Sequence, residues 1–401
     1  MKYTPVPFDV NLRPEGFLVD VDSLFAALAK LQDRRDARGL RYALVTVLVF
    51  IILAKLAGED HLRGIAQWVQ LRKEALAEAL GLAKPQAPHA TTYSRVLRWA
   101  VDIEELEQVV SQFFAAQPQT GQSVVVNLDG KTLRGTIPAG QTKGVHLLAA
   151  YLPQEGWVLL QVEVGSWENE IPAAMRILQQ LDLRGKIVTG DALLTQRELS
   201  TQIVEAGGEY VWRVKGNQAR LKEDIEVLFA PESCMPGFSP SHKDFRTAIT
   251  RDKGHGRLER RTLTASSLLK GYVSWPYAEQ VFRLERRFRR IGDGKLMEET
   301  TYGVTSLTAT EASSERLLHL ARAHWGIENG LHYRRDETFR EDRCRLKGQG
   351  AQAMAAINNL VLGLLRNRST EYIPDARRYY AAHLEEAVAL VLRSPAPGAP
   401  G

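Results

Sequence analysis

Two stretches in which an apolar strand runs straight into an aspartate constrain the fold of this chain most. In SVVVNLDGKT the strand predicted over 123–128 ends at Asp129, and in KIVTGDALLTQ a strand through Ile187 and Val188 ends at Asp191. One such acid usually caps a helix or lies in a solvated turn. Two of them, at the ends of strands that lie side by side, would instead form a metal site.

The elements around these strands predict an α/β fold with a ribonuclease-H-like catalytic core. Three β-rich runs separated by Gly or Pro turns are followed by helices that alternate with strands, in the order β-β-β-α-β-α-β. The first helix begins at Pro172, and the second opens with Thr195 and Glu198 at capping-box spacing. Strands are expected at 123–128, 145–152 and 157–164, directly before Asp191, and at 210–216.

In this topology the fourth strand lies parallel to the first and next to it. Open α/β sheets bind their ligands at the carboxyl ends of such strands, so Asp129 and Asp191 are expected to be neighbours. Two carboxylates at such a short distance repel each other. The positive charge of Mg²⁺, which takes oxygen ligands, offsets this repulsion. A site with two ions about 3.5–4 Å apart needs at least one further carboxylate.

Glu328, in HWGIENGLH, is the best candidate for that third carboxylate. It lies beside the apolar face of a predicted helix, so we expect it to point toward the body of the protein, where an unpaired acid is unfavourable. Glu341 and Asp342 are rivals, but their charged loop favours a solvated role. His324 lies one helical turn before Glu328 and is expected to contact a phosphate or to orient a water.

Each of the three acids also has a purely structural interpretation. Asp129 would be a turn residue, and Asp191 would cap a helix at its entry. Glu328 would form a buried salt bridge with an arginine such as Arg322 or Arg335. The residues alone leave these alternatives open.

The rest of the chain divides into further regions. Residues 1–118 carry apolar residues three and four positions apart and predict an all-helical N-terminal domain. Its run YALVTVLVFIILAKLAG is interrupted by Lys55 and is shorter than the ~20 residues that a membrane span needs, so we interpret it as a buried core helix. Residues 220–310 predict a β-rich insertion. The core then consists of 119–219 and 311–370, and 371–401 hold a C-terminal helix and a disordered Pro/Gly-rich tail.

The composition excludes several classes of protein. With 401 residues, 44% of them hydrophobic and 25% charged, the chain is long enough for two or three globular domains. Its two cysteines, Cys234 and Cys344, exclude a disulfide framework and a Cys-rich zinc module. We see no signal peptide and no membrane span, and we therefore expect a cytoplasmic protein.

Clusters of basic residues indicate a polyanionic partner, which a net charge of +5 permits but does not require. RDKGHGRLERR begins at Arg251, RLERRFRR at Arg283 and RRDETFREDRCRLK at Arg334. Each phosphate that such residues neutralise releases counterions, although acids between them can make the same segments ordinary solvated faces. Further candidates to hold a phosphate or a base, or simply to form a turn, are Lys215, Asn217 and Gln218 in KGNQ.

Several of these motifs resemble one known family. The segments NLDGKTLRG, SWENEIPAAMRILQQLDLRGKIVTGDALLTQ, YVWRVKGNQ and HWGIENGLHYRRDETFREDRCR resemble the ISAs-type, H-repeat-associated DDE transposases of bacterial insertion sequences. The helical segment LQDRRDARGLRYALVTVLVFIILAKLAGEDHLRGIAQW is similar to the domain that precedes the catalytic core in that family. The resemblance extends over nearly the whole chain.

The resemblance implies a DNA transposase that cleaves the ends of an insertion sequence and joins them to target DNA. Asp129, Asp191 and Glu328 match the Asp-Asp-Glu triad, which uses Mg²⁺ or Mn²⁺, and we expect two ions. A homodimer is expected in the complex that brings two ends together. The tyrosine of the wider superfamily's Tyr-x2-Arg-x3-Glu-x6-Lys signature is absent, since that position is Ala321. The predicted DNA-binding residues are Lys131, Arg134, Lys215, Asn217, Gln218, His324, Arg335, Arg343 and Arg345.

Two alternative functions remain at this point. One is a catalytically inactive or domesticated derivative that only binds DNA, which the presence of all three acids disfavours. The other is a ribonuclease-H-like nuclease that cuts without strand transfer. A haloacid-dehalogenase-type phosphatase would need a second Asp two positions after Asp129, where this chain has Lys131.

Overall fold

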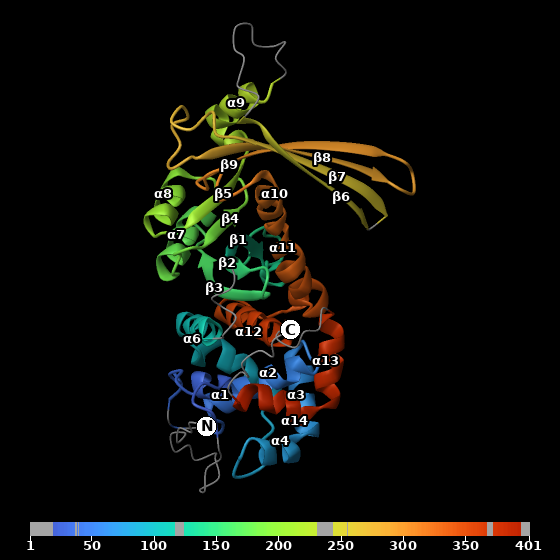
Figure 1. Cartoon of the computed structure of the whole chain (residues 1–401). Helices are drawn as coiled ribbons and strands as arrows, with labels where there is room; N and C mark the ends of the chain where they lie inside the picture. Colours follow the sequence, from blue (N-terminus) through green and yellow to red (C-terminus); the bar gives the residue numbers. More distant parts are fainter. Residues whose placement is uncertain are drawn as a thin grey trace. The chain divides into compact units, whose positions relative to one another are not determined.

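The computed structural model describes residues 19–36, 38, 40–116, 124–230, 244–254, 256–366 and 372–393, which together form a mixed α/β structure with a large sheet (Figure 1). Cys234, His255 and the predicted disordered tail from 394 lie outside these residues. The chain divides into two compact units. We call Met1–Ser123, Gly130–Ser166 and Asn329–Gly401 the helical unit, and Val124–Asp129 with Trp167–Glu328 the sheet unit.

Two apolar helices form the centre of the helical unit. Helix α2 (Leu44–Leu56) is buried along almost its whole length, including Lys55, because it has no polar face, and α12 (Gln349–Arg366) packs against it. The prediction of a buried core helix here is confirmed, and no helix in the described ranges is long and apolar enough to cross a membrane. Around them lie α1 (Leu24–Leu28), α3 (Leu62–Leu71), α4 (Lys73–Ala79), α5 (Ala90–Arg95), α6 (Ile103–Ala115), α13 (Ile373–Ala382) and α14 (Leu384–Leu392).

A β-hairpin completes the helical unit. Strands β2 (His146–Leu152) and β3 (Trp157–Val164) pair antiparallel, and α6 and α12 both pack on β3. Phe114 of α6 stacks on Trp157 with ring centroids 5.2 Å apart. Asp102 caps α6, because its side chain accepts a hydrogen bond of 3.0 Å from the N–H of Glu105.

The sheet unit contains seven strands in the order β1-β4-β5-β9-β8-β7-β6. Strand β4 pairs parallel with β1 on one side and with β5 on the other, which confirms that the first and fourth strands of the predicted order are neighbours. The four strands that follow are antiparallel to one another. The bounds are β1 (Val125–Thr132), β4 (Ile187–Gly190), β5 (Glu209–Val214), β6 (Arg246–Gly254), β7 (Arg257–Ser266), β8 (Gln280–Arg290) and β9 (Leu296–Thr305).

Helices cover both faces of the parallel strands. Helix α10 (Ser314–Ala323) packs on β5, β6 and β7, and its leucines share one apolar core with Val125, Ile187 and Val211. Helices α7 (Glu170–Gln180) and α8 (Arg197–Glu205) pack together, and Trp212 reaches α8 from the opposite face of β5 with a hydrogen bond of 3.0 Å to Ser200. Helix α9 (Ala219–Leu228) follows β5, and the short α11 (Trp325–Ile327) follows α10.

The predicted capping box at the start of α8 is wrong. Gln196 precedes the helix, and the hydroxyl of Thr195 instead donates a hydrogen bond of 2.6 Å to the carbonyl oxygen of Arg213. Thr195 therefore joins the segment after β4 to the end of β5. This contact ties together the two chain segments that border Asp191.

Candidate active site

Residues at one level of three neighbouring parallel strands, on the α10 face, form the candidate site. Asp191 directly follows β4, but β1 continues through Asp129 to Thr132, so the prediction that the first strand ends at Asp129 is wrong. Leu128 pairs with Gly190, and Gly190 pairs with Trp212, so Asp129, Asp191 and Arg213 are the next residues of β1, β4 and β5. Neighbouring strands lie about 4.8 Å apart, and alternate residues share a face. Val125 and Val211 pack in the core under α10, so Asp129 and Arg213, at even spacing from them, lie on that same face.

Buried polar side chains two residues before Asp129 and Asp191 join the end of α10 to these strands. The Thr189 hydroxyl donates a hydrogen bond of 2.7 Å to Asn127 Oδ1, and Asn127 Nδ2 donates one of 2.7 Å to the carbonyl oxygen of Ala323. His324 Nδ1 lies 3.5 Å from the Thr189 hydroxyl. Because Asn127 and Thr189 each precede an acid by two residues, these side chains hold the end of α10 beside the candidate site.

The burial of His324 does not favour its predicted contact with a phosphate, and the alternative that it orients a water stays a prediction. The residue is only 7% exposed, and its ring lies against Thr189. A buried imidazole at this position orients the end of α10 rather than reaching a backbone phosphate.

The interpretation of Asp191 as a helix cap is wrong, because Gln196 precedes α8; one oxygen of Asp191 instead holds the turn that follows β4. Its Oδ1 accepts hydrogen bonds from the N–H groups of Leu193 at 2.9 Å and Leu194 at 3.2 Å. Its other oxygen, Oδ2, makes no hydrogen bond to the residues that the structure describes. Gly190 precedes it because a Cβ there would lie 2.9 Å from the Trp212 ring. The turn therefore fixes the carboxylate and leaves one oxygen for a ligand.

Glu328 is exposed, so the prediction that it points toward the body of the protein is wrong. The buried salt bridge proposed as its alternative is also absent, because Arg322 pairs with Asp252 at 3.2 Å and Arg335 pairs with Glu341. Glu328 begins a π-helical turn, Glu328–His332, after α11. Such turns are rare and occur frequently at functional sites.

Arg213 is a residue of this site that the sequence-based prediction missed. Burial lowers the pKa of its guanidinium, while the carboxylates of Glu299, Glu328 and Asp191 act in the opposite direction. The guanidinium therefore lies within the electrostatic field of both Asp191 and Glu328. The available signal was a charged residue in the middle of the otherwise apolar strand YVWRVKG.

The donor chemistry of this site fits a hard divalent cation. Asp129 and Asp191 offer carboxylate oxygens from the same level of adjacent strands, and Mg²⁺ is usually held by one or two carboxylates together with waters and substrate phosphates. Among the residues described, no three His, Cys, Asp or Glu side chains are grouped closely enough to hold a metal ion. The joint three-carboxylate site therefore stays a prediction.

Two residues of KGNQ that were predicted to contact a phosphate or a base make hydrogen bonds within the protein instead. Asn217 Nδ2 donates a hydrogen bond of 2.6 Å to the carbonyl oxygen of Ala192, and Gln218 Nε2 donates one of 2.9 Å to that of Thr195. Both amides thus hold the loop that follows Asp191, in agreement with their structural interpretation. Lys215 is exposed and remains a candidate DNA contact.

The predicted DNA-binding residues of the helical unit differ in their accessibility. Lys131 pairs with Asp336 at 2.5 Å, whereas Arg134, Arg343 and Arg345 are exposed. Arg335 is 0% exposed, so its predicted contact with DNA is wrong for this structure.

Arg335 instead belongs to a buried polar network in the helical unit. It donates hydrogen bonds of 2.7 Å to Glu341 and 2.8 Å to Gln161. The predicted solvated role of Glu341 is therefore wrong, and although burial would raise the pKa of this carboxyl, its ion pair with Arg335 lowers it. Burial raises the pKa of Glu107, which accepts a hydrogen bond from Gln161, to about 8. Asn358 also donates to Glu341.

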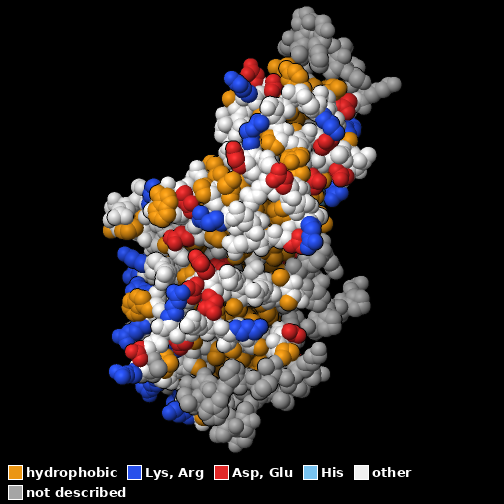
Figure 2. Space-filling view, turned by 90° about the vertical axis from the view of Figure 1, so that its left-hand side faces the viewer, with side chains coloured by type: hydrophobic (Ala, Val, Ile, Leu, Met, Phe, Trp, Pro, Cys, Tyr) orange, Lys and Arg blue, Asp and Glu red, His pale blue; other side chains and the backbone are white. Residues whose placement is uncertain are grey.

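The predicted basic cluster at 283–290 is largely compensated by acids. Arg287 pairs with Glu298 at 3.2 Å across β8 and β9, and Arg286 pairs with Glu259 across β7 and β8. These ion pairs favour the interpretation of 283–290 as an ordinary charged face. Figure 2 faces the left-hand side of Figure 1, and acidic and basic side chains are interspersed on the upper part of that view as well. Exposed basic residues at 251–261 are Arg251, Lys253 and Arg260.

Comparison with known proteins gives a consistent result for both parts of the chain. The family model "Transposase DDE domain" matches residues 120–364, and the model "DDE_Tnp_1-associated" matches residues 25–114. A putative transposase, YncI, of Escherichia coli O157:H7 is 26% identical over 87% of this chain and 88% of its own length. The H repeat-associated putative transposase YhhI of Escherichia coli K12 is 24% identical over 87% of this chain and 92% of its own.

Among solved structures, a chain of a piggyBac transposase synaptic complex with hairpin DNA aligns with 91% of this chain and 78% of its own. The TM-score is 0.39 at 11% identity, which is below the level at which a shared fold is established.

Proposed function

The chain belongs to the DDE transposase family, and we propose that Asp129, Asp191 and Glu328 are its catalytic carboxylates. It is a DNA transposase, and the DDE family generally uses divalent metal ions. The observation that carries the assignment is the register of β1 and β4, which puts Asp129 and Asp191 at the same level of two adjacent parallel strands. The parallel β1–β4 pair and the β2–β3 hairpin support a ribonuclease-H-like core.

In this proposal Asp129 and Asp191 hold Mg²⁺ or Mn²⁺, and Glu328 completes the site. When bound, two such ions supply Lewis-acid stabilisation of the attacking and leaving oxygens of a phosphodiester. Asp191 is suited to this role because two backbone N–H groups hold its Oδ1, while Oδ2 accepts no hydrogen bond from the described residues. Arg213 places a positive charge near the position where phosphoryl charge develops.

The substrates assigned to the site are the ends of an insertion sequence and a target DNA. Water attacks the phosphodiester at an end and frees a 3′-hydroxyl, and that hydroxyl then attacks the target phosphodiester and displaces a 3′-oxygen. Exposed residues on both units, such as Lys215, Arg343 and Arg345, supply phosphate contacts. Two copies of the chain would hold two ends.

Strand transfer separates this function from that of a nuclease that only cuts. The purified chain, given precut insertion-sequence ends, a target plasmid and Mg²⁺, is expected to join the ends to the plasmid, and chelation with EDTA is expected to abolish joining. Cutting of uncut ends without any joining of precut ends would favour the nuclease. Binding of ends with neither reaction would favour the inactive, DNA-binding derivative.

Replacing Arg213 with glutamine is expected to tighten the binding of Mn²⁺ by about tenfold, because removal of a cation near two metal-binding carboxylates removes a repulsion of roughly 1–2 kcal/mol. Isothermal titration with Mn²⁺ in the absence of DNA measures the affinity. Arg184→Gln, at an exposed arginine paired with Asp182, serves as the control and should leave the affinity unchanged. An unchanged or weaker affinity in Arg213→Gln would show that Arg213 does not act on the ion.

A further inference from the structure

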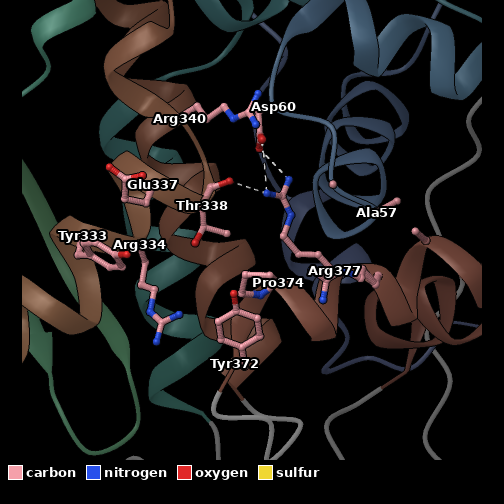
Figure 3. Close-up of a pocket in the computed structure, with 13 residues that line it drawn as sticks. Ala57, Asp60, Tyr333, Arg334, Glu337, Thr338, Arg340, Tyr372, Pro374 and Arg377 are labelled. Atoms are coloured by element: carbon pink, nitrogen blue, oxygen red, sulfur yellow. Dashed lines mark hydrogen bonds and ion pairs between the residues drawn. The ribbon is translucent and has the colours of Figure 1, made fainter. Parts of the chain in front are cut away.

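A second candidate binding site lies in the helical unit, in a cavity of about 510 Å³ (Figure 3). Its walls come from the turn after α2, the π-helical turn Arg334–Thr338 with the residues around it, and the first turns of α13. A cavity of this size falls in the range that holds small organic ligands and is larger than a phosphate group needs. Its charged and aromatic lining residues are Asp60, Tyr333, Arg334, Glu337, Arg340, Tyr372, Arg377 and Arg378.

Positive charge is in excess in this cavity, because four arginines face two acids. Arg377 is fully used: it pairs with Asp60 at 2.7 Å and donates hydrogen bonds to the carbonyl oxygens of Lys55 and Thr338 (Figure 3). Arg378 pairs with Asp375. Two cationic side chains of the cavity are thus already neutralised within the protein.

The other two arginines have no such partner. Neither Arg334 nor Arg340 forms an ion pair with any residue that the structure describes, and the Nε of Arg334 is buried without a hydrogen-bond acceptor. A buried donor of this kind is unfavourable unless a ligand supplies the acceptor. The cavity therefore offers positive charge to an anion at its lower end, from Arg334, and at its upper end, from Arg340 (Figure 3).

Backbone strain supports a functional role for Arg340. Its φ of +49° lies in the left-handed region, which costs a non-glycine residue about 1–3 kcal/mol and is found preferentially at ligand sites. The strained residue comes directly before the short 3₁₀ helix Glu341–Arg343, whose Glu341 is buried against Arg335. The surrounding structure thus holds Arg340 at the edge of the cavity at an energetic cost.

Two aromatic side chains complete the site. Tyr333 and Tyr372 are 57% and 54% exposed, and Tyr372 precedes the N-terminus of α13, whose helix dipole also favours an anion. In Figure 3 the side chains of Arg334 and Tyr372 both line the lower part of the cavity. Arginine for the backbone and an aromatic ring for the base is the combination with which proteins bind unpaired nucleotides.

We propose that this cavity binds one unpaired nucleotide of DNA, with Arg334 on its phosphate and Tyr372 against its base, while Arg340 adds positive charge at the other end of the cavity. The proposal depends on the transposase function in one respect: it takes the bound polyanion to be DNA. It requires no catalysis, so it can be tested apart from the catalytic carboxylates.

Fluorescence anisotropy with the full chain in EDTA tests the proposal on two probes, a fully paired duplex and the same duplex with one unpaired nucleotide. The parent is expected to bind the second probe more tightly, and Tyr372→Ala is expected to lose that preference through about a tenfold loss of affinity for it alone. Arg334→Gln should weaken binding to the unpaired probe and lower the salt dependence by about one phosphate contact. Arg378→Gln, whose arginine lines the cavity but pairs with Asp375, is the matched control and should keep the preference.

Equal affinity of the parent for both probes overturns the proposal, as does an equal loss on both probes in Tyr372→Ala. Tyr372→Phe keeps an aromatic ring and should retain the preference, so a folding defect in the alanine variant is recognised. A failure here leaves the catalytic assignment intact, because Asp191→Asn is expected to keep the preference for the unpaired probe while losing cleavage.

Discussion

Asp191→Asn is expected to reduce DNA cleavage and strand transfer by about a thousandfold or more, because the site loses a carboxylate that holds the divalent ion and with it the stabilisation of phosphoryl charge. The turn at Asp191 should survive, since an amide oxygen can still accept the hydrogen bonds from Leu193 and Leu194. DNA binding should therefore remain. Single-turnover cleavage of end-containing DNA in Mg²⁺, with gel-shift binding in parallel, measures both properties.

Asp182→Asn is the matched control for this substitution. Asp182 lies in the same unit, also accepts a hydrogen bond from a backbone N–H two residues on, and pairs with Arg184 at the surface. Its replacement is expected to leave cleavage at the parental rate. If Asp191→Asn also cut at that rate, the assignment of Asp191 as a metal ligand would be wrong.

Arg335→Ala is expected to destabilise the protein by about 3–5 kcal/mol, since removal of one partner leaves a buried, uncompensated charge. The substitution removes the hydrogen bonds that Arg335 donates to Glu341 at 2.7 Å and to Gln161 at 2.8 Å, and Arg335 has no exposed surface. Chemical denaturation followed by circular dichroism should show the loss as a lower midpoint.

Two further variants distinguish this stabilising role from a contact with DNA. In Arg335→Met combined with Glu341→Gln neither buried charge remains, so much of the lost stability should return. Arg343→Ala, in the same basic segment but at an exposed position, should keep parental stability and weaken DNA binding. Parental stability in Arg335→Ala together with weakened DNA binding would contradict the structural role.

Local patterns along the chain predicted the elements that place the site. The β-rich runs before Asp129 and Asp191 became parallel neighbours in register, because strand periodicity and the order of elements leave few arrangements for an α/β sheet. The uniformly apolar run at α2 became a buried helix, since it has no face to present to water. The resemblance to DDE transposases, drawn from motifs near these elements, is confirmed by the family model over 120–364.

The environment of individual charged residues was not predictable in the same way. Glu341 was expected in solvent and is buried, while Glu328 was expected to point inward and is exposed. Thr195 matched a capping box, yet its hydroxyl bonds to the carbonyl oxygen of Arg213 on the next strand. In each case the partner that decides the outcome lies on another element.

The amino-acid sequence by itself therefore determined the element order, the place of the two aspartates on adjacent strands and the family, because these depend on periodicity and local spacing. Only the tertiary structure decided which charged groups meet: Arg213 with the acids of the site, Arg335 with Glu341 in the interior, and Arg334 and Arg340 at an open cavity. The reason is that burial and charge pairing are set by contacts between distant segments, and the free energy of a charge depends on those contacts.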